Sequence, residues 1–392
     1  MKTVFKNFRV VDAHRDEIID VLVEDGKIVE LGKNLNAKQT IEGDNLVLVP
    51  SFCDLHVHFR EPGYEYKETI ETGSQAALKG GYTGVNCMGN TNPICDNQET
   101  LDYILEKGRQ TEIDVDQVVA ITKGFEGQDI RHLDTIQPIK YISDDGHGVV
   151  SDLIIYQAML KAKEKGFGLM LHEENRDFSS FDYRIAEDLM TIRDVYLAGA
   201  TKAKVHFCHV STKASLEAIR WGKQQGYDIS CEVTPHHIVL KDSDYRVNPP
   251  LRTQEDIEAI FKAINDGTID AIATDHAPHS SEDKEKGSPG LIGLESSFSV
   301  CYEALVKTNR ISLSRLVELM STTPNRLLGY RKGKIEAGYQ ADFAILDLNH
   351  PYIFDEKEIY SKSSNTPFLN QKFSAKVVAT YRKGKKVYEN HR

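Results

Sequence analysis

The sequence predicts an α/β protein in which a (β/α)8 TIM-type barrel carries a small β-sandwich domain formed from both chain ends. Two observations predict this architecture. Through the middle of the chain, short apolar runs of strand type alternate with helical patterns. Each end holds only a few short strand patterns, too few to enclose a core alone. We therefore expect residues 1–50 and 335–392 to share the β-sandwich and residues 51–334 to form the barrel.

The two chain ends resemble each other in their strand and turn signals. Asp25-Gly26 and the stretch 382–385 each separate two strand runs and are typical of hairpin turns. The strand runs span residues 4–11, 18–24, 27–31 and 46–49 at the start, and 343–348, 375–381 and 386–388 at the end.

The middle of the chain contains eight strand runs with helical patterns between them. The helical patterns 151–165 and 212–225 begin at Ser151 and Thr212, which are good N-cap residues. The polar stretch 280–290 follows the last strand and has almost no apolar side chains, so we expect a loop that is mobile when the site is empty. The strand runs span residues 47–58, 81–88, 115–122, 139–143, 168–172, 204–210, 229–234 and 270–274.

Composition excludes several classes of function. The chain has 392 residues, of which 40% are hydrophobic and 27% charged, as in a globular protein. The net charge of −11 argues against nucleic acid or an anionic membrane as a partner. Neither a secretory signal pattern nor a bilayer-length apolar stretch is present in this sequence, so we expect a cytoplasmic location.

The six cysteines form no Cys-x-x-Cys pair, so we expect buried free thiols in a reducing compartment. Cys53 and Cys208 lie beside candidate metal ligands in the sequence. Because neighbouring side chains alternate along a strand, we expect both thiols to point away from those ligands.

The pair His56 and His58 follows an apolar strand run and is a candidate metal site. Two residues at i and i+2 on a strand point to the same face, so both imidazoles could reach one ion. Imidazole nitrogen is a preferred ligand of zinc. An isolated His-x-His is equally typical of polar residues on a half-exposed strand.

Ligand-type side chains recur at later strand ends, which favours the metal interpretation. Barrel enzymes assemble their sites at the carboxyl ends of the strands. Burying many ionisable groups is costly unless they are paired or bind metal. Four histidines and two aspartates suit two metal ions that share a carboxylate, and the nitrogen-rich set favours zinc. The later strand ends carry Asp144, Asp145, His172, His209, Asp275 and His279.

The run from Asp54 to Gly63, Asp-Leu-His-Val-His-Phe-Arg-Glu-Pro-Gly, strongly resembles bacterial dihydroorotases of the class I type, in the amidohydrolase superfamily. Together with Thr69-Ile-Glu-Thr-Gly73, the matching motifs cover nearly the whole chain. The other motifs span residues 90–91, 143–146, 209–212, 234–237, 248–252, 273–279, 293–295 and 365–368.

The resemblance implies two Zn²⁺ ions per chain. Asp145 would bridge them, in place of the carbamylated lysine of many amidohydrolases, and we expect Lys140 to be structural. The implied ligands are His56, His58 and Asp275 for the first ion, and His172 and His209 for the second.

The resemblance also implies reversible hydrolysis of (S)-dihydroorotate to N-carbamoyl-L-aspartate in pyrimidine biosynthesis, with Asp275 as the proton shuttle. Zinc would supply hydroxide near neutral pH. Arg60 presents a planar guanidinium suited to the substrate carboxylate, with a salt bridge at the site's rim as the alternative. The implied substrate contacts are His58, Arg60, Asn90, Asn248, His279, Pro289 and Gly290.

Two other functions remain open. A hydantoinase, dihydropyrimidinase or allantoinase would use the same chemistry, but Arg60 and the bridging Asp145 favour a dihydroorotase. A non-catalytic scaffold for aspartate carbamoyltransferase is disfavoured because every implied metal ligand is present. We expect a homodimer that acts on a small molecule, with aspartate carbamoyltransferase as a further candidate partner.

Overall fold

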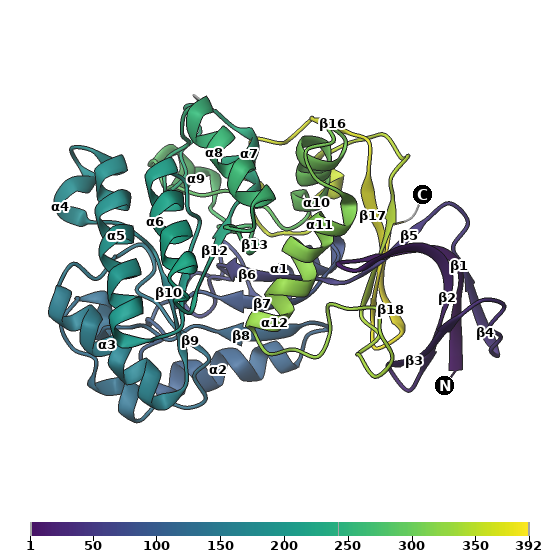
Figure 1. Cartoon of the computed structure of the whole chain (residues 1–392), viewed down its shortest axis with the longest axis horizontal. Helices are drawn as coiled ribbons and strands as arrows, with labels where there is room; N and C mark the ends of the chain where they lie inside the picture. The colour runs from purple at the N-terminus through teal and green to yellow at the C-terminus, as the bar shows by residue number, and fades with distance from the viewer. Residues whose placement is uncertain (1, 242, 391–392) are drawn as a thin grey trace.

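An eight-stranded sheet from both chain ends lies beside a larger region of parallel strands and helices in the computed structural model, which describes residues 2–241 and 243–390 (Figure 1). Pairing of β5 with β14, where Pro50 lies opposite Phe343, joins the two ends of the chain. Strands from both chain ends therefore belong to one sheet. In pairing order the strands are β18 (Lys385–Glu389), β17 (Lys376–Arg382), β14 (Phe343–Asp347), β5 (Val47–Pro50), β1 (Lys2–Asp12), β2 (Arg15–Glu24) and β3 (Lys27–Gly32), with β4 (Gln39–Glu42) paired to β1.

This sheet curls so that its two halves face each other. Strands β1 and β17 are three positions apart, roughly 14 Å in a flat sheet. The ring centroids of Phe5 on β1 and Tyr381 on β17 are nevertheless only 5.0 Å apart. The curled sheet therefore encloses an apolar core of its own, which also contains Phe8, Leu48 and Phe343.

The predicted strand 47–58 is wrong as a single element, because the chain changes sheets at Ser51. The Ser51 N–H donates to the Asp342 carbonyl beside the first sheet, whereas the Phe52 N–H donates to the Gly81 carbonyl. Both strands beside the break are fully buried. Their largely apolar residues therefore read as one continuous run in the sequence.

Eight parallel strands form the second region, in sheets of three and five strands. Isolated parallel bridges pair Val119 with Ile142 and Val57 with His276, one at each junction between the two sheets. Apolar side chains such as Leu55, Met88 and Met170 cluster among these strands. The strands are β6 (Phe52–Val57), β7 (Tyr82–Cys87), β8 (Asp114–Gln117), β9 (Tyr141–Ile142), β10 (Gly168–Leu171), β11 (Val205–Phe207), β12 (Ile229–Val233) and β13 (Ala271–Ile272).

Helices surround these strands on the outside (Figure 1). The predicted caps are confirmed, since Ser151 and Thr212 accept hydrogen bonds from backbone N–H groups in the first turns of α3 and α6. None of the helices in the described part of the chain is long and apolar enough to cross a membrane. The main helices are α1 (Ile70–Lys79), α2 (Gln98–Arg109), α3 (Asp152–Lys165), α4 (Arg176–Ser179), α5 (Tyr183–Thr201), α6 (Lys213–Gln224), α7 (Pro235–Val239), α8 (Gln254–Asn265), α9 (Ser281–Glu285), α10 (Ser297–Cys301), α11 (Leu313–Val317) and α12 (Thr323–Leu327).

Shorter elements complete the chain. A small antiparallel pair outside both regions consists of β15 (Tyr352–Ile353) and β16 (Lys372–Phe373). The 3-10 turns are η1 (Lys123–Phe125), η2 (Arg131–Asp134) and η5 (Glu356–Glu358), and π-helical turns are η3 (Tyr302–Val306) and η4 (Glu318–Thr322).

The stretch 280–290 is not only a loop, which corrects the prediction from its polar composition. It contains α9, which begins with a capping box formed by Ser280 and Asp283. Lys284 on α9 donates to the carbonyl oxygens of Arg246, Ser288 and Gly290 at 3.2, 2.9 and 2.8 Å. Polar contacts of this kind hold a segment that has few apolar side chains to bury.

Candidate active site

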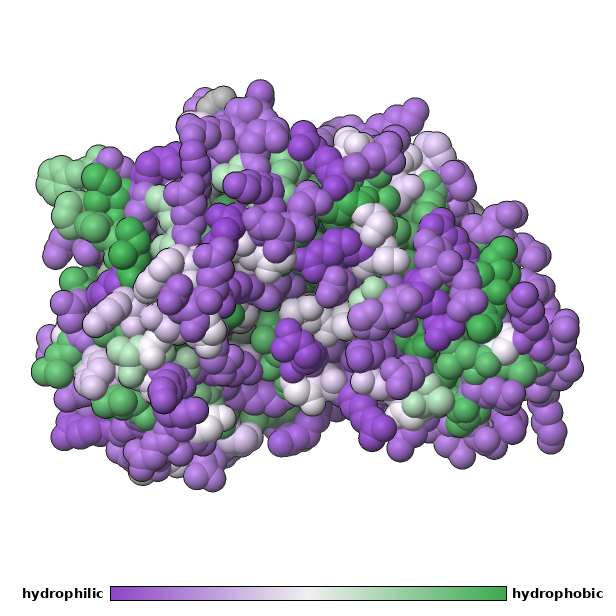
Figure 2. All heavy atoms as spheres, in the orientation of Figure 1, coloured by the Kyte–Doolittle hydropathy of each residue, from purple (hydrophilic) through white to green (hydrophobic). Residues whose placement is uncertain are grey.

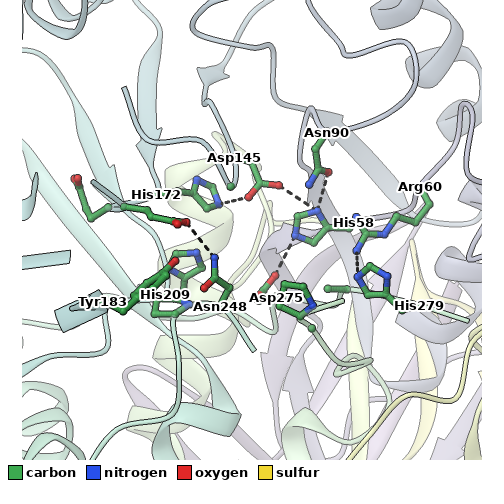
Figure 3. A pocket seen from close by; sticks show the side chains of 17 residues that line it. His58, Arg60, Asn90, Asp145, His172, Tyr183, His209, Asn248, Asp275 and His279 are labelled. Atoms are coloured by element: carbon green, nitrogen blue, oxygen red, sulfur yellow. Dashed lines mark hydrogen bonds and ion pairs between the residues drawn. The ribbon is translucent and has the colours of Figure 1, made fainter. Parts of the chain in front are cut away.

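A cavity of about 220 Å³ opens at the carboxyl ends of the parallel strands (Figure 3). His56 lies beneath it with 1% of its surface exposed, and its Nε2 is 3.2 Å from the Nε2 of His172. The structure thus brings together every site residue that the sequence predicted. The predicted residues that line the cavity are His58, Arg60, Asn90, Asp145, His172, His209, Asn248, Asp275, His279, Pro289 and Gly290.

Asp145 lies between two imidazoles in the floor of this cavity (Figure 3). Its Oδ1 is 3.0 Å from His172 Nε2, and its Oδ2 is 3.4 Å from His58 Nδ1. Asp275 occupies the other side of His58, with Oδ1 3.0 Å from His58 Nε2 and 3.5 Å from His56 Nε2. Two carboxylates and several imidazoles therefore converge within a few ångströms.

Burial keeps two of the imidazoles in the form that binds metal ions. The pKa of His209 lies well below its usual range because the ring is buried and because His172 and His56 are close. The pKa of His58 is lowered as well, chiefly by burial. Neutral imidazole is the form that coordinates metal ions.

The residues present fit a divalent metal ion. The ligand atoms of His56, His58 and Asp275 all lie within 4.8 Å of one another. Asp145 Oδ2 is buried and has no hydrogen-bond partner within residues 2–241 and 243–390. A buried carboxylate oxygen without a donor is costly, and a cation would satisfy it. Nitrogen and carboxylate ligands together suit zinc.

A cationic group forms the opposite wall of the cavity. Arg60 Nη2 lies 3.2 Å from His279 Nε2, and Arg60 Nε donates to the Pro278 carbonyl at 3.2 Å. Burial and the charges of Arg60 and Lys67 lower the pKa of His279 to about 3. This wall therefore presents a fixed positive charge to the cavity.

The prediction about Cys208 is wrong. Its sulfur lies within 4.8 Å of ligand nitrogens of His56 and His172, toward the cluster rather than away from it. The strand alternation fails because β11 ends at Phe207 and His209 takes a positive φ of 35°. All six cysteines are buried and free, as expected, and burial raises the pKa of the Cys208 thiol.

Comparison with known proteins agrees with this geometry. The model of the amidohydrolase family matches residues 47–387. The chain belongs to the amidohydrolase family. A dihydroorotase of Clostridium botulinum (strain Eklund 17B / Type B) is 45% identical over 397 residues, which cover 99% of this chain and all of that protein. A dihydroorotase of Clostridioides difficile (strain 630) is 38% identical, covering 98% of this chain and 99% of that protein.

Solved structures of a hydantoinase and a dihydropyrimidinase share the fold. The L-hydantoinase of Arthrobacter aurescens is 26% identical with a TM-score of 0.88, covering all of this chain and 96% of its own. The dihydropyrimidinase of Brevibacillus agri NCHU1002 has a TM-score of 0.89 at 22% identity, covering all of this chain and 95% of its own. At that identity the second likeness concerns the fold alone.

Three residues of this amidohydrolase's site have strained backbones. Arg60, His209 and Asp275 take positive φ angles of 63°, 35° and 48°. Non-glycine residues rarely adopt such angles, and they cluster at functional sites because surrounding contacts hold them there. These angles direct side chains at the strand ends into the cavity.

Sequence reasoning missed Glu232, which orients His56. Glu232 is fully buried on β12, and its carboxylate accepts from His56 Nδ1 at 2.9 Å and His206 Nε2 at 3.0 Å. Because a carboxylate only accepts, Nδ1 of His56 carries the proton and Nε2 keeps its lone pair for a metal ion. The available signal was a glutamate inside the predicted strand run 229–234.

Replacing Glu232 by glutamine is expected to weaken metal binding by about 10–100-fold, the range found for such supporting carboxylates. The glutamine amide is uncharged and can both donate and accept, so it no longer fixes the proton on Nδ1 of His56. Competition with a zinc chelator measures this affinity. Glu187→Gln is the matched control, since Glu187 is also buried but accepts from the Ser211 N–H and Arg252. Equal metal affinity in both variants would contradict the role of Glu232.

Other supporting contacts reach the remaining ligands. Asn90 Oδ1 lies 2.9 Å from His58 Nδ1, so this predicted substrate contact also orients a predicted ligand. Asn248 donates to Glu174 at 3.1 Å, and Glu174 and Tyr183 line the cavity although the sequence did not single them out. Lys140 bonds to Asp116 at 2.6 Å, in agreement with the structural role expected for it.

Gly290 has to be glycine for the cavity wall to close. Its φ is 122°, and a Cβ placed there would lie 2.7 Å from the Ala277 Cβ. Asn365 supports the same wall by donating to the carbonyls of Ala277 and Gly290 at 3.1 Å. The wall therefore combines segments that are far apart in the sequence.

Proposed function

We propose that this amidohydrolase interconverts (S)-dihydroorotate and N-carbamoyl-L-aspartate. Hydrolysis opens the dihydroorotate ring, and the reverse reaction is the ring-closing step of pyrimidine biosynthesis. The chain is a cyclic amide hydrolase, and the two relatives described above are dihydroorotases. The observation that carries the proposal is the Arg60–His279 wall, which faces the imidazole and carboxylate cluster across one small cavity. A cyclic amide that carries a carboxylate suits this cavity, because its carboxylate can meet the Arg60–His279 wall while its amide faces the imidazole and carboxylate cluster.

We assign two zinc ions to the cluster. His56, His58 and Asp275 would hold one ion, His172 and His209 the other, and Asp145 would join them. The support is the position of Asp145, with one oxygen near His172 and the other near His58. When bound, zinc ions supply Lewis-acid polarisation of the amide carbonyl and hydroxide at neutral pH.

Asp275 is the residue that moves protons. It lines the cavity, and its Oδ1 lies 3.0 Å from His58 Nε2. In hydrolysis it takes a proton from the attacking water and delivers it to the leaving ring nitrogen. In ring closure it removes the proton from the ureido nitrogen. Arg60 meanwhile holds the substrate carboxylate, and Asn90, Asn248 and the backbone near Gly290 orient the ring.

We also propose a closed (β/α)8 barrel for residues 51–334 and a β-sandwich shared by residues 1–50 and 335–392. The bridges at both junctions of the parallel sheets support the closed barrel. The curled eight-stranded sheet supports the sandwich.

A homodimer remains part of the proposal. Exposed apolar side chains gather over α3, α4 and α5, where Figure 2 shows apolar patches at one end of a mostly polar face. Exposed apolar patches are typical of interaction sites. Aspartate carbamoyltransferase as a partner and the cytoplasmic location stay predictions. The exposed side chains are Leu153, Tyr156, Leu160, Phe178, Phe181, Ile185, Leu189, Ile192 and Tyr196.

Turnover of dihydroorotate, hydantoin, dihydrouracil and allantoin by the zinc-loaded chain tests the function. We expect a clear preference for dihydroorotate, because only this ring carries a carboxylate for Arg60. Arg60→Met should raise KM for dihydroorotate by about 10–100-fold, as expected for lost charge-assisted hydrogen bonds. Its KM for dihydrouracil should change much less. A wild-type preference for hydantoin or dihydrouracil would instead favour the hydantoinase alternative.

A further inference from the structure

His279 lies between two side chains that can only donate hydrogen bonds. Lys67 Nζ is 3.3 Å from its Nδ1, and Arg60 Nη2 is 3.2 Å from its Nε2. A neutral imidazole has a single acceptor nitrogen, and an imidazolium has none. The two flanking cations disfavour the imidazolium, in agreement with the lowered pKa of His279. One of these two contacts therefore joins two donors and needs an additional acceptor.

The surroundings show which contact can receive that acceptor. Arg60 and His279 both line the cavity, so a bound anion can lie against Nη2 and Nε2 together (Figure 3). Lys67 lies behind His279, outside the cavity lining, and only 13% of its side chain is exposed. Nδ1 of His279 is the acceptor that its ammonium meets on the cavity side, and the Asp283 carboxylate, 3.4 Å away, is a second acceptor.

We propose that Lys67 is a positioning residue that donates to Nδ1 of His279 and thereby fixes the imidazole proton on Nε2. The Nε2–H and the Arg60 guanidinium then both donate to the substrate carboxylate, an assignment that rests on the proposed function. Without Lys67, Nε2 would be free to accept from Arg60, and His279 would no longer recognise a carboxylate.

Helix α9 holds Lys67 in place through Asp283. The Asp283 carboxylate lies 3.4 Å from Lys67 Nζ and accepts from the Ser280 hydroxyl at 2.8 Å within the capping box. Lys67 Nζ also lies 5.4 and 5.5 Å from the ring centroids of Tyr64 and Tyr66, which stabilise a cation. The series Asp283–Lys67–His279 thus links the helix to the cavity.

Replacing Lys67 by methionine tests whether this lysine affects substrate binding through His279. We expect KM for dihydroorotate, and Kd for orotate, to rise by about tenfold or more, the effect of one lost charge-assisted hydrogen bond. The carboxylate is remote from the reacting amide, so kcat should change much less. Lys67→Arg should restore most of the loss, because arginine also only donates.

Lys107→Met is the matched control. Lys107 is also 3.4 Å from a carboxylate, that of Glu61, and 5.7 Å from the ring of Tyr103, but it does not line the cavity. Its KM should stay at the wild-type value. A KM for Lys67→Met that equals the value for Lys107→Met would overturn the proposal.

Nitrogen-15 NMR of the zinc-loaded, histidine-labelled chain reads the tautomer directly, with His279→Gln identifying the signals. We expect the proton on Nε2 in the wild type, with and without orotate, and a loss of this preference in Lys67→Met. A wild-type His279 with its proton on Nδ1 would overturn the role of Lys67 alone. Failure of the wild type to turn over dihydroorotate would overturn the proposed function instead.

Discussion

Replacing Asp275 by asparagine is expected to lower kcat by at least about 10²–10⁴-fold, the range for loss of a general acid–base group. The carboxylate lies at the cavity floor, with its Oδ1 3.0 Å from His58 Nε2. The asparagine amide keeps the size of the side chain but cannot take a proton from water. Steady-state turnover of dihydroorotate, together with the metal content, measures the effect.

Asp144→Asn serves as the control for this variant. Asp144 is a buried aspartate at another strand end, but it accepts from the Thr122 N–H at 2.9 Å and does not line the cavity. Its variant should keep kcat within several-fold of the wild type. Near-normal turnover by Asp275→Asn would rule out the proton-shuttle role.

Asp145→Ala should lose the second metal ion and nearly all turnover. Asp145 is the residue whose two oxygens lie near His172 and His58, so its removal leaves each ion short of a ligand. Metal analysis should approach two zinc ions per wild-type chain and about one per variant chain, which follows from a bridging ligand. Chelation of the wild type should abolish activity, and zinc should restore it.

The same assignment predicts that activity is independent of carbon dioxide. An aspartate bridge requires no carbamylated lysine, so removing bicarbonate should leave kcat unchanged. Loss of wild-type activity on carbon dioxide depletion would show that a carbamate is present and that the Asp145 assignment is wrong. Full activity of Asp145→Ala would contradict it equally.

Much of the fold and of the site was predictable from local patterns. His56 lies on β6 and His58 directly follows it, and an i, i+2 spacing along an extended chain gives both side chains a common face. Helix caps such as Ser151 and Thr212 act over three residues and are equally local. The parallel-strand pattern then brings strand-end residues such as His172 and His209 to one edge.

Other features depend on contacts between distant segments. Glu232 and His56 are 176 positions apart, so no local pattern links the carboxylate with the imidazole that it orients. Lys67 is separated from His279 by 212 positions, and its role is visible only once both surround one cavity wall. The change of sheet at Ser51 likewise follows from the partner that each strand finds.

The sequence by itself determined the alternation of strands and helices, the candidate metal-binding side chains and the family, because these depend on residue type and short spacing. Only the tertiary structure decided the direction of the Cys208 side chain, the helix within 280–290 and the partners that orient His56 and His279. Hydrogen bonds and buried charges depend on which atoms meet in space, and chain topology sets those encounters across hundreds of residues.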